Sequence, residues 1–349
     1  MESPLQVAVF GAYGHTGRFV VAELLERGLR PVLAGRDTER LQELARAHPG
    51  LDVRPASTAD PDSLTRALAG TAAVINCAGP FAATAAPVIE AALAARIPYA
   101  DIAGEVEAVA DTFAHYTEPA RAAGLPVIPA MAFFGALGDL LTTAALGDWP
   151  SADEVSLAYA LSSWHPTAGT RASSQVSRER RNGRRLVLTN GSLALRTDQA
   201  PTTQWVFPPP LGKQTVVAEF TTADSITLSR HIRVPHLHTY MTAAAVKDVL
   251  APGAEPPVPI DANGRSDQTF LVEAVVRNGE TERRATARGQ DIYAVSAPLV
   301  VEAICRVLDG RTKTVGAAAP GEIFDAPDFL RALSSHLTVE FAPHLDHVL

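Results

Sequence analysis

Three glycines near the start of the chain, Gly11, Gly14 and Gly17, stand at three-residue spacing in the segment GAYGHTGRFV. They follow the apolar run Val7 to Phe10 and open a segment with the apolar spacing of a helix, expected to begin at Thr16. Such a loop can hold a pyrophosphate, because free N–H groups and the dipole at a helix N-terminus favour an anion. The alternative is a tight structural turn. We favour a dinucleotide loop, with contacts from Gly11, Tyr13, Gly14, His15, Thr16 and Gly17.

Arg36 stands at the end of the second predicted strand, in VLAGRD, where an NAD enzyme carries an acid that binds the ribose 2′-hydroxyl. The next residue, Asp37, is suited to cap the following helix. A guanidinium offers a bidentate fork to a 2′-phosphate and a flat face to adenine, and Arg40 lies one turn further along. A mere surface arginine is the weaker interpretation, since a cation at a helix start opposes the helix dipole. These residues predict NADP(H) as the cofactor.

Two further strand ends carry polar residues, in NCAGPF after the fourth predicted strand and YADIAGE at the fifth. Ligands of parallel sheets bind beyond these carboxyl ends. We predict Asp101 with Tyr99 as the proton donor, and Glu105 as a substrate-binding residue or a helix cap. Cys77 either lines the site or fills the core. Beside the nicotinamide ribose we expect Asn76, Cys77, Ala78, Gly79 and Pro80.

Two signals leave alternatives open. Within the glycine loop, His15 either contacts phosphate or substrate or faces solvent. In HPTAGTRASS, Thr170 lies at a predicted helix start with Arg171 beside it. This pair either binds an anionic substrate group or belongs to an ordinary helix cap.

Basic residues and histidines in the second half have simpler interpretations. Asn182-Gly183 is typical of a helix stop, and arginines in a last helical turn complement the dipole. Docking of a phosphorylated carrier or coenzyme A is the alternative for these arginines, which are Arg178, Arg180, Arg181, Arg184 and Arg185. His236 and His238 alternate on a predicted strand, but without a third ligand they predict no metal site.

The elements that must position these residues alternate between strand and helix. Each predicted strand is a short apolar run, as expected for a strand buried on both faces. A helix is predicted after each strand, among them one from about Thr84 to Ala95 and one from Val106 to Ala123. This alternation predicts an α/β fold with a doubly wound parallel sheet. The predicted strands are 7–10, 31–34, 52–55, 73–76, 98–102 and 126–130.

The pattern changes after Trp149-Pro150, where runs at 154–161, 186–189 and 216–220 read as strands. Segments 268–277 and 281–287 flank Asn278-Gly279, which favours a type I′ hairpin turn. We therefore predict a mixed, mostly antiparallel α+β domain. The predicted division is a Rossmann domain at 1–133, a substrate or dimerisation domain at 134–290 and C-terminal helices at 291–349, which could pack back on the first domain.

Composition excludes several classes of protein. The 349 residues are 47% hydrophobic and 19% charged, as in a folded protein rather than a disordered one. A net charge of -8 argues against nucleic-acid binding, which needs a concentrated basic face. Two cysteines form no disulfide framework, and we see no signal peptide or membrane-spanning stretch. These features predict a cytoplasmic protein with a small-molecule substrate.

The segments GAYGHTGRFV, AGRD, VINCAGPF and YADIAGE, in this order, resemble the saccharopine dehydrogenase-like oxidoreductases. The resemblance covers roughly residues 7–131, continues weakly into SSWHPTAGTRASS and is faint beyond. It implies a Rossmann domain with an inserted α/β domain and an NADP-linked activity. Some members of the family act on imines formed from amino acids, and others resemble enoyl reductases.

These observations lead to one leading functional hypothesis and one rival. The leading one is an NADP(H)-dependent oxidoreductase that reduces a C=N or C=C bond of a small organic substrate, and a homodimer is one expectation for its assembly. No nucleophilic elbow of the form G-x-S-x-G and no cysteine–histidine pair is evident, which favours hydride transfer. The rival is a non-catalytic NADP(H) sensor, because the fold alone does not imply catalysis.

Overall fold

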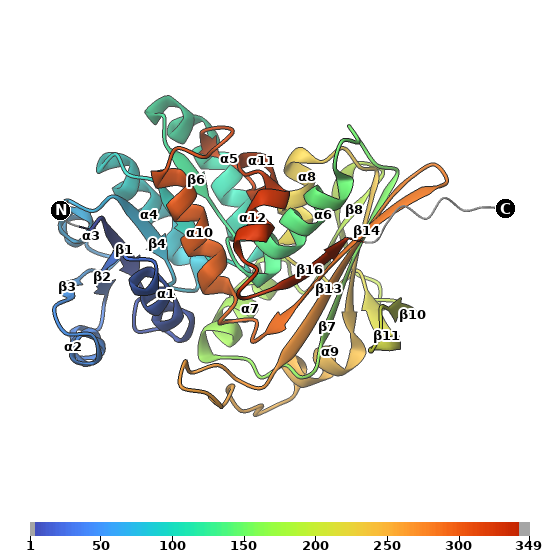
Figure 1. The fold of residues 1–349 in the computed structure, drawn as a ribbon, viewed down its shortest axis with the longest axis horizontal. Helices are drawn as coiled ribbons and strands as arrows, with labels where there is room; N and C mark the ends of the chain where they lie inside the picture. Colours follow the sequence, from blue (N-terminus) through green and yellow to red (C-terminus); the bar gives the residue numbers. More distant parts are fainter. Residues whose placement is uncertain (1–3, 342–349) are drawn as a thin grey trace.

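Seven parallel strands form the first sheet, in the order β15-β6-β5-β4-β1-β2-β3 (Figure 1). The structure is a computed structural model that describes residues 4–341. The direction of strand progression reverses between β1 and β4, which opens the crevice where such sheets bind ligands. The predicted doubly wound sheet is confirmed. Its strands are β1 (Gln6–Phe10), β2 (Arg30–Gly35), β3 (Asp52–Pro55), β4 (Ala73–Asn76), β5 (Tyr99–Asp101), β6 (Pro126–Ile128) and β15 (Gly316–Ala317).

Five helices connect the first six of these strands. Asp37 caps the second helix by accepting a hydrogen bond from the Arg40 N–H at 3.1 Å. Asp60 caps the third by accepting from the Ser63 N–H at 3.2 Å, with a proline at the next position. The helices are α1 (His15–Glu26), α2 (Thr38–Ala47), α3 (Pro61–Leu68), α4 (Phe81–Ala94) and α5 (Val106–Ala123).

The second sheet has nine strands and is mixed. Its main path runs β10-β11-β12-β7-β13-β14-β16, and β8 pairs with β12 and β9. Only the β12–β7 pair is parallel within the described residues, so the predicted mostly antiparallel second sheet is confirmed. The strands are β7 (Glu154–Leu161), β8 (Arg185–Thr189), β9 (Ser192–Arg196), β10 (Thr202–Phe207), β11 (Gly212–Ala218), β12 (His236–Thr242), β13 (Thr269–Asn278), β14 (Thr281–Gln290) and β16 (Thr338–Phe341).

The β13–β14 hairpin differs from its prediction in the turn. Asn278 is the last paired residue of β13, opposite Thr281, so the loop residues are Gly279 and Glu280. Only Gly279 has a positive φ, of 59°. This is the pattern of a type II′ turn, with glycine at the first central position, rather than the type I′ turn expected from Asn278-Gly279.

Helices cover one face of the second sheet, and a hairpin covers part of the other. Helix α6 packs on β13 and β14, where alternate residues such as Val155 and Leu157 of β7 enter the main core. On the opposite face, the Trp205 indole N–H donates to Glu273 at 2.7 Å, so β10–β11 folds over the sheet. The remaining elements here are η1 (Phe133–Leu137), α6 (Gly138–Leu146), α7 (Ala168–Arg180), α8 (Asp224–His231) and α9 (Ala243–Leu250).

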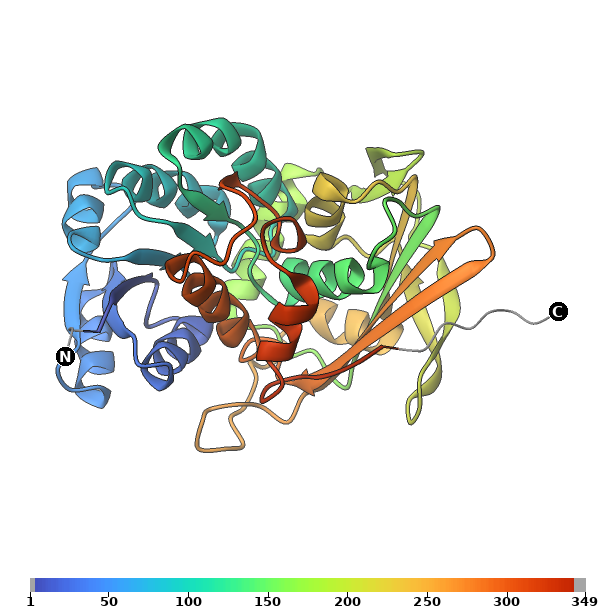
Figure 2. The ribbon, with the colours of Figure 1, turned by 45° about the horizontal axis from the view of Figure 1, so that its top comes forward.

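The C-terminal segment returns to the first sheet (Figures 1 and 2). Helix α10 (Ser296–Leu308) lies against α1, and β15 adds the outermost strand beside β6. Two short helices follow, α11 (Pro320–Ile323) and α12 (Ala326–Ala332). The segment predicted as helices thus also contains β15 and β16. The domain boundaries at 133/134 and 290/291 stay a prediction.

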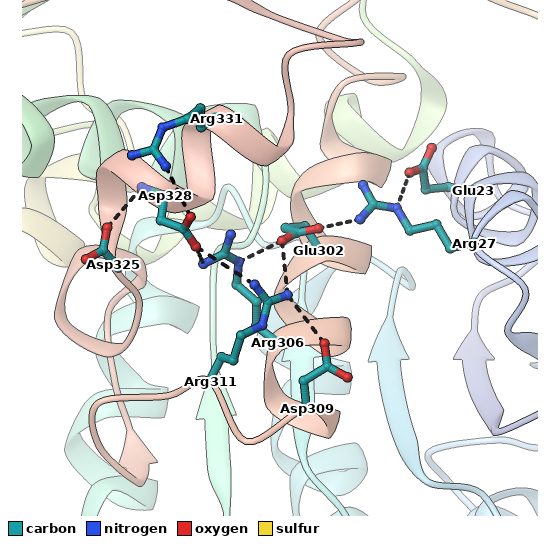
Figure 3. A network of polar contacts seen from close by, with 9 residues as sticks. All are labelled: Glu23, Arg27, Glu302, Arg306, Asp309, Arg311, Asp325, Asp328 and Arg331. Carbon is teal, nitrogen blue, oxygen red and sulfur yellow. Dashed lines mark hydrogen bonds and ion pairs between the residues drawn. The ribbon is translucent and has the colours of Figure 1, made fainter.

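A polar network joins α1, α10 and α12 (Figure 3). The carboxylate of Glu302 on α10 pairs with Arg27 of α1 and, at 2.7 Å, with Arg306 one turn along. Arg306 is only 2% exposed, pairs with Asp328 at 2.8 Å and lies 4.9 Å over the Phe329 ring. Because Glu302 and Arg306 are buried and paired with each other as well as with Arg27 and Asp328, the network fixes the C-terminal segment to α1.

In residues 4–341, no helix is both long enough and apolar enough to cross a membrane.

Candidate cofactor and substrate site

The glycine loop lies between β1 and α1, and its three glycines have different structural roles. Gly11 has a φ of +87°, and a Cβ there would stand 2.9 Å from the Cβ of Ala78. A Cβ on Gly17 would stand 2.3 Å from the Gly11 carbonyl oxygen, so Gly17 lets α1 pack on the strand. A Cβ on Gly14 would stand 3.1 Å from the Gly11 carbonyl oxygen, which is also a tight contact. Gly14 is the N-cap of α1 and no side chain caps this helix, so its first N–H groups could bind a pyrophosphate.

The end of β2 carries two guanidinium groups. Arg36 is exposed directly after the strand, and the Arg40 guanidinium lies 4.6 Å over the Tyr13 ring. Tyr13 itself packs on Gly35, where an added Cβ would stand 2.8 Å from the ring. The nearest acid in sequence, Asp37, is engaged as the cap of α2. The end of β2 thus presents two guanidinium groups, while its nearest acid is engaged in capping α2.

His15 lies between the two halves of the chain. Its ring meets those of Phe19 and Tyr293 edge-on, with centroids 5.4 and 5.2 Å away. Burial lowers the pKa of His15, and its Nε2 atom has no hydrogen-bond partner within the described residues. His15 is therefore a neutral ring that packs against Tyr293. Thr16, the next residue of α1, is half-buried.

The Asn76–Pro80 loop is ordered by its first residue. The Asn76 side-chain oxygen accepts from the Ala78 N–H at 3.0 Å, and its amide donates to Thr84 and Tyr99, each at 3.2 Å. Burial raises the pKa of the Cys77 thiol, so this group stays neutral and packs against the core. Neutrality argues against a nucleophilic role for Cys77. Gly79 is exposed, and its neighbour Ala78 touches Gly11.

Tyr99 and Asp101 form a buried pair. The Tyr99 hydroxyl donates to Asp101 Oδ2 at 2.8 Å, while Oδ1 accepts from the N–H groups of Ala103 at 2.9 Å and Ala130 at 2.8 Å. Asp101 is 1% exposed, and burial raises its pKa to about 6. The Asp101 carboxylate therefore fastens β5 to the loop after β6, and its raised pKa makes it a weaker acid than an exposed aspartate.

Glu105 has a capping role that its position in the sequence does not reveal. Its two carboxylate oxygens accept from the N–H groups of Phe81 at 2.6 Å and Ala82 at 2.9 Å, so it caps α4 rather than the helix that follows it. This explains why α4 begins at Phe81, three residues before its predicted start. Glu105 is buried and thus links the fourth and fifth strand-end loops.

The start of α7 lies against the Asn76–Pro80 loop and is linked through Tyr293 to the glycine loop. The Thr167 hydroxyl caps α7 by accepting from the Thr170 N–H at 3.1 Å, and the Thr170 hydroxyl bonds with that of Tyr293 at 3.0 Å. Arg171 donates to the carbonyl of Ala254. One turn on, the Ser173 hydroxyl is 2.7 Å from the position a Cβ on Gly79 would take.

The structure thus brings the predicted residues at the glycine loop, β4, β5 and α7 to one edge of the parallel sheet. Two residues that the sequence did not single out join them, Ser173 and Tyr293. His236 and His238 lie elsewhere, on β12, with parallel rings 6.2 Å apart. Among the described residues, no group of three or more potential ligands could hold a metal ion.

The two most distinct hollows among the described residues lie away from this edge. One of about 580 Å³ is at the amino ends of β1, β2 and β4, and one of about 180 Å³ lies between α12 and β16. Because ligands of parallel sheets bind at the carboxyl ends, neither hollow is the predicted site.

Comparison with known proteins agrees with this geometry. A family model described as NAD(P)H-binding matches residues 11–101. A probable mitochondrial saccharopine dehydrogenase-like oxidoreductase of Arabidopsis thaliana is 33% identical over 147 residues, which is 38% of this chain and 32% of the relative. The resemblance to this family is confirmed. The chain is related to the saccharopine dehydrogenase-like oxidoreductases through an NAD(P)-binding domain.

Two further similarities extend this relation. A Mycobacterium tuberculosis protein named as a candidate trans-acting enoyl reductase is 29% identical over 140 residues, which is 38% of this chain and 33% of that protein. Each of these matches spans about a third of the relative's length. Apo saccharopine dehydrogenase (L-Glu forming) from Saccharomyces cerevisiae superposes with a TM-score of 0.66 at 12% identity, over 97% of this chain and 100% of that chain. The fold of saccharopine dehydrogenase is therefore present across nearly the whole chain.

Proposed function

We propose that this chain is an NADP(H)-dependent oxidoreductase that reduces a C=N or C=C bond of a small organic substrate. The observation that carries the proposal is the crevice between β1 and β4, where no side chain caps the N-terminus of α1 at Gly14 and Arg36 and Arg40 flank the end of β2. The relation to saccharopine dehydrogenase-like oxidoreductases supports the chemistry, and the enoyl reductase name of one relative supports a C=C substrate.

NADPH supplies a hydride when bound, so the chain need only bind it, orient the substrate and provide a proton. The N-terminus of α1 would hold the pyrophosphate, and Arg36 the 2′-phosphate. Asn76 to Pro80 would lie against the nicotinamide ribose. Asp101 and Tyr99 are the proposed source of the proton, directly or through water, because their shared hydrogen bond lies at the carboxyl end of β5.

Cofactor choice tests the first part of the proposal. Arg36→Ala should weaken NADPH binding by about 1.5–3 kcal/mol, the range for a hydrogen bond to a charged group, and leave NADH binding unchanged. Titration calorimetry with both nucleotides measures this difference. Arg46→Ala, another exposed arginine on α2, is the matched control and should change neither affinity. Equal affinity of the unmutated chain for NADPH and NADH would exclude the role of Arg36.

Turnover tests the second part. NADPH consumption with a panel of imines, oxo acids and enoyl thioesters should identify the substrate class. Asp101→Asn should then lower turnover by roughly 10²-fold or more and leave NADPH affinity unchanged, the scale of a lost acid–base group. Turnover within about threefold of the unmutated enzyme would remove Asp101 from the reaction on that scale. Tyr99→Phe, which keeps the ring, separates loss of the hydroxyl from loss of packing. No turnover on the panel, with NADP-dependent binding of a partner protein, would favour the sensor.

A further inference from the structure

Helix α7 crosses the two loops that would hold the nicotinamide end of the cofactor. At its first turn, Thr170 is tied through Tyr293 to His15 in the glycine loop. One turn on, Ser173 is in contact with Gly79 in the Asn76–Pro80 loop. Figure 1 shows α7 between the parallel and the mixed sheet, and the helix also packs against α4 and α5. The helix therefore covers the predicted nicotinamide side of the crevice.

Apolar burial contributes little to holding α7 in place. Its sequence, AGTRASSQVSRER, contains few apolar residues, and Ser177 is its one buried residue. A helix without a broad apolar face depends on polar contacts for its position. The chain leaves α7 through a turn in which Asn182 and Gly183 both have positive φ, of 51° and 72°.

Besides the contacts of its first turn, α7 has a second group of polar contacts at its C-terminal end, facing α5. The Glu107 carboxylate pairs with Arg181 at 2.9 Å and accepts from the Ser177 hydroxyl at 2.6 Å. The Ser177 hydroxyl in turn accepts from Arg181 at 2.7 Å. One turn further along α5, Asp111 pairs with Arg180 at 2.7 Å. Glu107 and Arg181 are each 16% exposed, so water and salt reach this cluster.

We propose that α7 is a lid over the nicotinamide end of the cofactor site, and that the Glu107–Ser177–Arg181 cluster is the latch that holds it shut. This inference rests on the proposed function, since it assumes that the crevice binds NADPH. The latch touches neither cofactor loop, so it stabilises the closed position with and without nucleotide. Opening then precedes both binding and release, as for other active-site lids.

Glu107→Gln tests the latch, because it removes the charge and keeps the shape. Glu219→Gln is the matched control, since the Arg185–Glu219 pair has a similar length of 2.7 Å and similar exposure but lies outside the α5–α7 contact. Ser177→Ala is a second, milder variant. Two quantities are measured on the full chain, namely hydrogen exchange in residues 168–180 without nucleotide, and the association and dissociation rates of NADPH by stopped-flow fluorescence.

For Glu107→Gln we expect faster exchange in α7 and NADPH association and dissociation rates that rise together by about fivefold, the scale of a partly exposed ion pair. The dissociation constant should stay nearly constant. Ser177→Ala should show a smaller effect of the same kind, and Glu219→Gln none.

Four outcomes would overturn the lid. Unchanged exchange in α7 would mean that the cluster is not a latch. Faster exchange with unchanged nucleotide rates would mean that α7 does not gate the cofactor, and a rise in dissociation alone would mean that α7 merely contacts it. Failure of the unmutated chain to bind NADPH would refute the proposed function itself, and the lid with it.

Discussion

The contact of α10 with α1 and the contact of α7 with α5 both use arginine–carboxylate pairs, but the two helices differ in how deeply they are buried. Ten of the thirteen residues of α10 are buried, and Glu302, whose side chain is 5% exposed, pairs with Arg27 at the end of α1 and with Arg306 of α10 itself, which is 2% exposed. In α7 a single residue is buried, and its pairs with α5 are reached by solvent. Burial is therefore the variable that separates a fixed contact from one that can be released.

When a carboxylate is removed, the arginine that it leaves behind has different remaining partners in the two contacts. Without Glu302, Arg306 would keep Asp328 at 2.8 Å and the Phe329 ring, but at 2% exposure it has no solvent to replace the lost carboxylate. Arg181 keeps hydrogen bonds to Ser177 and, at 2.9 Å, to the Arg184 carbonyl, and it also meets solvent. Removing one carboxylate should therefore lower the free energy of unfolding strongly in the α10 contact and only slightly in the α7 contact.

The largest effect is expected for Glu302→Ala. It leaves Arg306 and Arg27 without the carboxylate that they share, and removing one member of a buried ion pair costs about 3–5 kcal/mol. Urea unfolding followed by circular dichroism measures the loss of unfolding free energy. A loss below about 1 kcal/mol, the level of an exposed pair, would make the two contacts alike.

An intermediate effect on stability is expected for His231 at the end of α8. Its ring pairs with the buried Asp139 of α6 at 3.1 Å. Burial opposes the charged ring, but the charge and hydrogen bond of Asp139, with Glu322 assisting and Lys313 opposing, raise the pKa of His231. A raised pKa means that the pair stabilises the fold fully below pH 6.5, and that this contribution is lost as pH rises through the folded value.

Unfolding free energies between pH 6.5 and 8.5 should therefore fall with pH, and His231→Gln should flatten the slope. Asp101 and Asp224, whose pKa values burial raises to about 6, titrate mainly below this window. An identical slope in both proteins would mean that His231 stays neutral in the fold.

The smallest effect on stability is expected for Glu107→Ala in the α7 contact. Exposed or partly exposed ion pairs contribute about 1 kcal/mol or less, and added salt weakens them further. Urea unfolding at low and high salt measures both effects. A loss comparable with that of Glu302→Ala would show that α7 is as firmly fixed as α10, and would count against the lid.

The parallel sheet could be predicted from sequence because its signals are local. Strands such as β1 and β4 are short apolar runs, and residues such as Asp60 and Gly28 mark helix ends in the sequence itself. The second sheet is harder, since β9 and β10 consist largely of exposed residues and show no clean alternation. Strand β15 is only 2 residues long and β16 has no buried residue, so neither shows a strand pattern within the segment predicted as helices.

The candidate site, like the fold, could be predicted only where its signals are local in the sequence. The glycine loop and Arg36 are local patterns, and the structure places them where the sequence predicts. The contacts of Glu105 with α4 and of Tyr293 with Thr170 join residues 24 and 123 positions apart, and such pairs leave no pattern in a single sequence. Ser173 was missed for the same reason, since only the fold brings it to Gly79.

The late position of β15 in the chain has a consequence for the order of synthesis. Strand β6 ends at Ile128, and its outer neighbour begins only at Gly316, about 190 residues later. At 5–20 residues per second a ribosome needs roughly 10–40 s to make that stretch. During this interval the nascent parallel sheet lacks α10 and has an unpaired strand edge at β6, which stays open until β15 has been made.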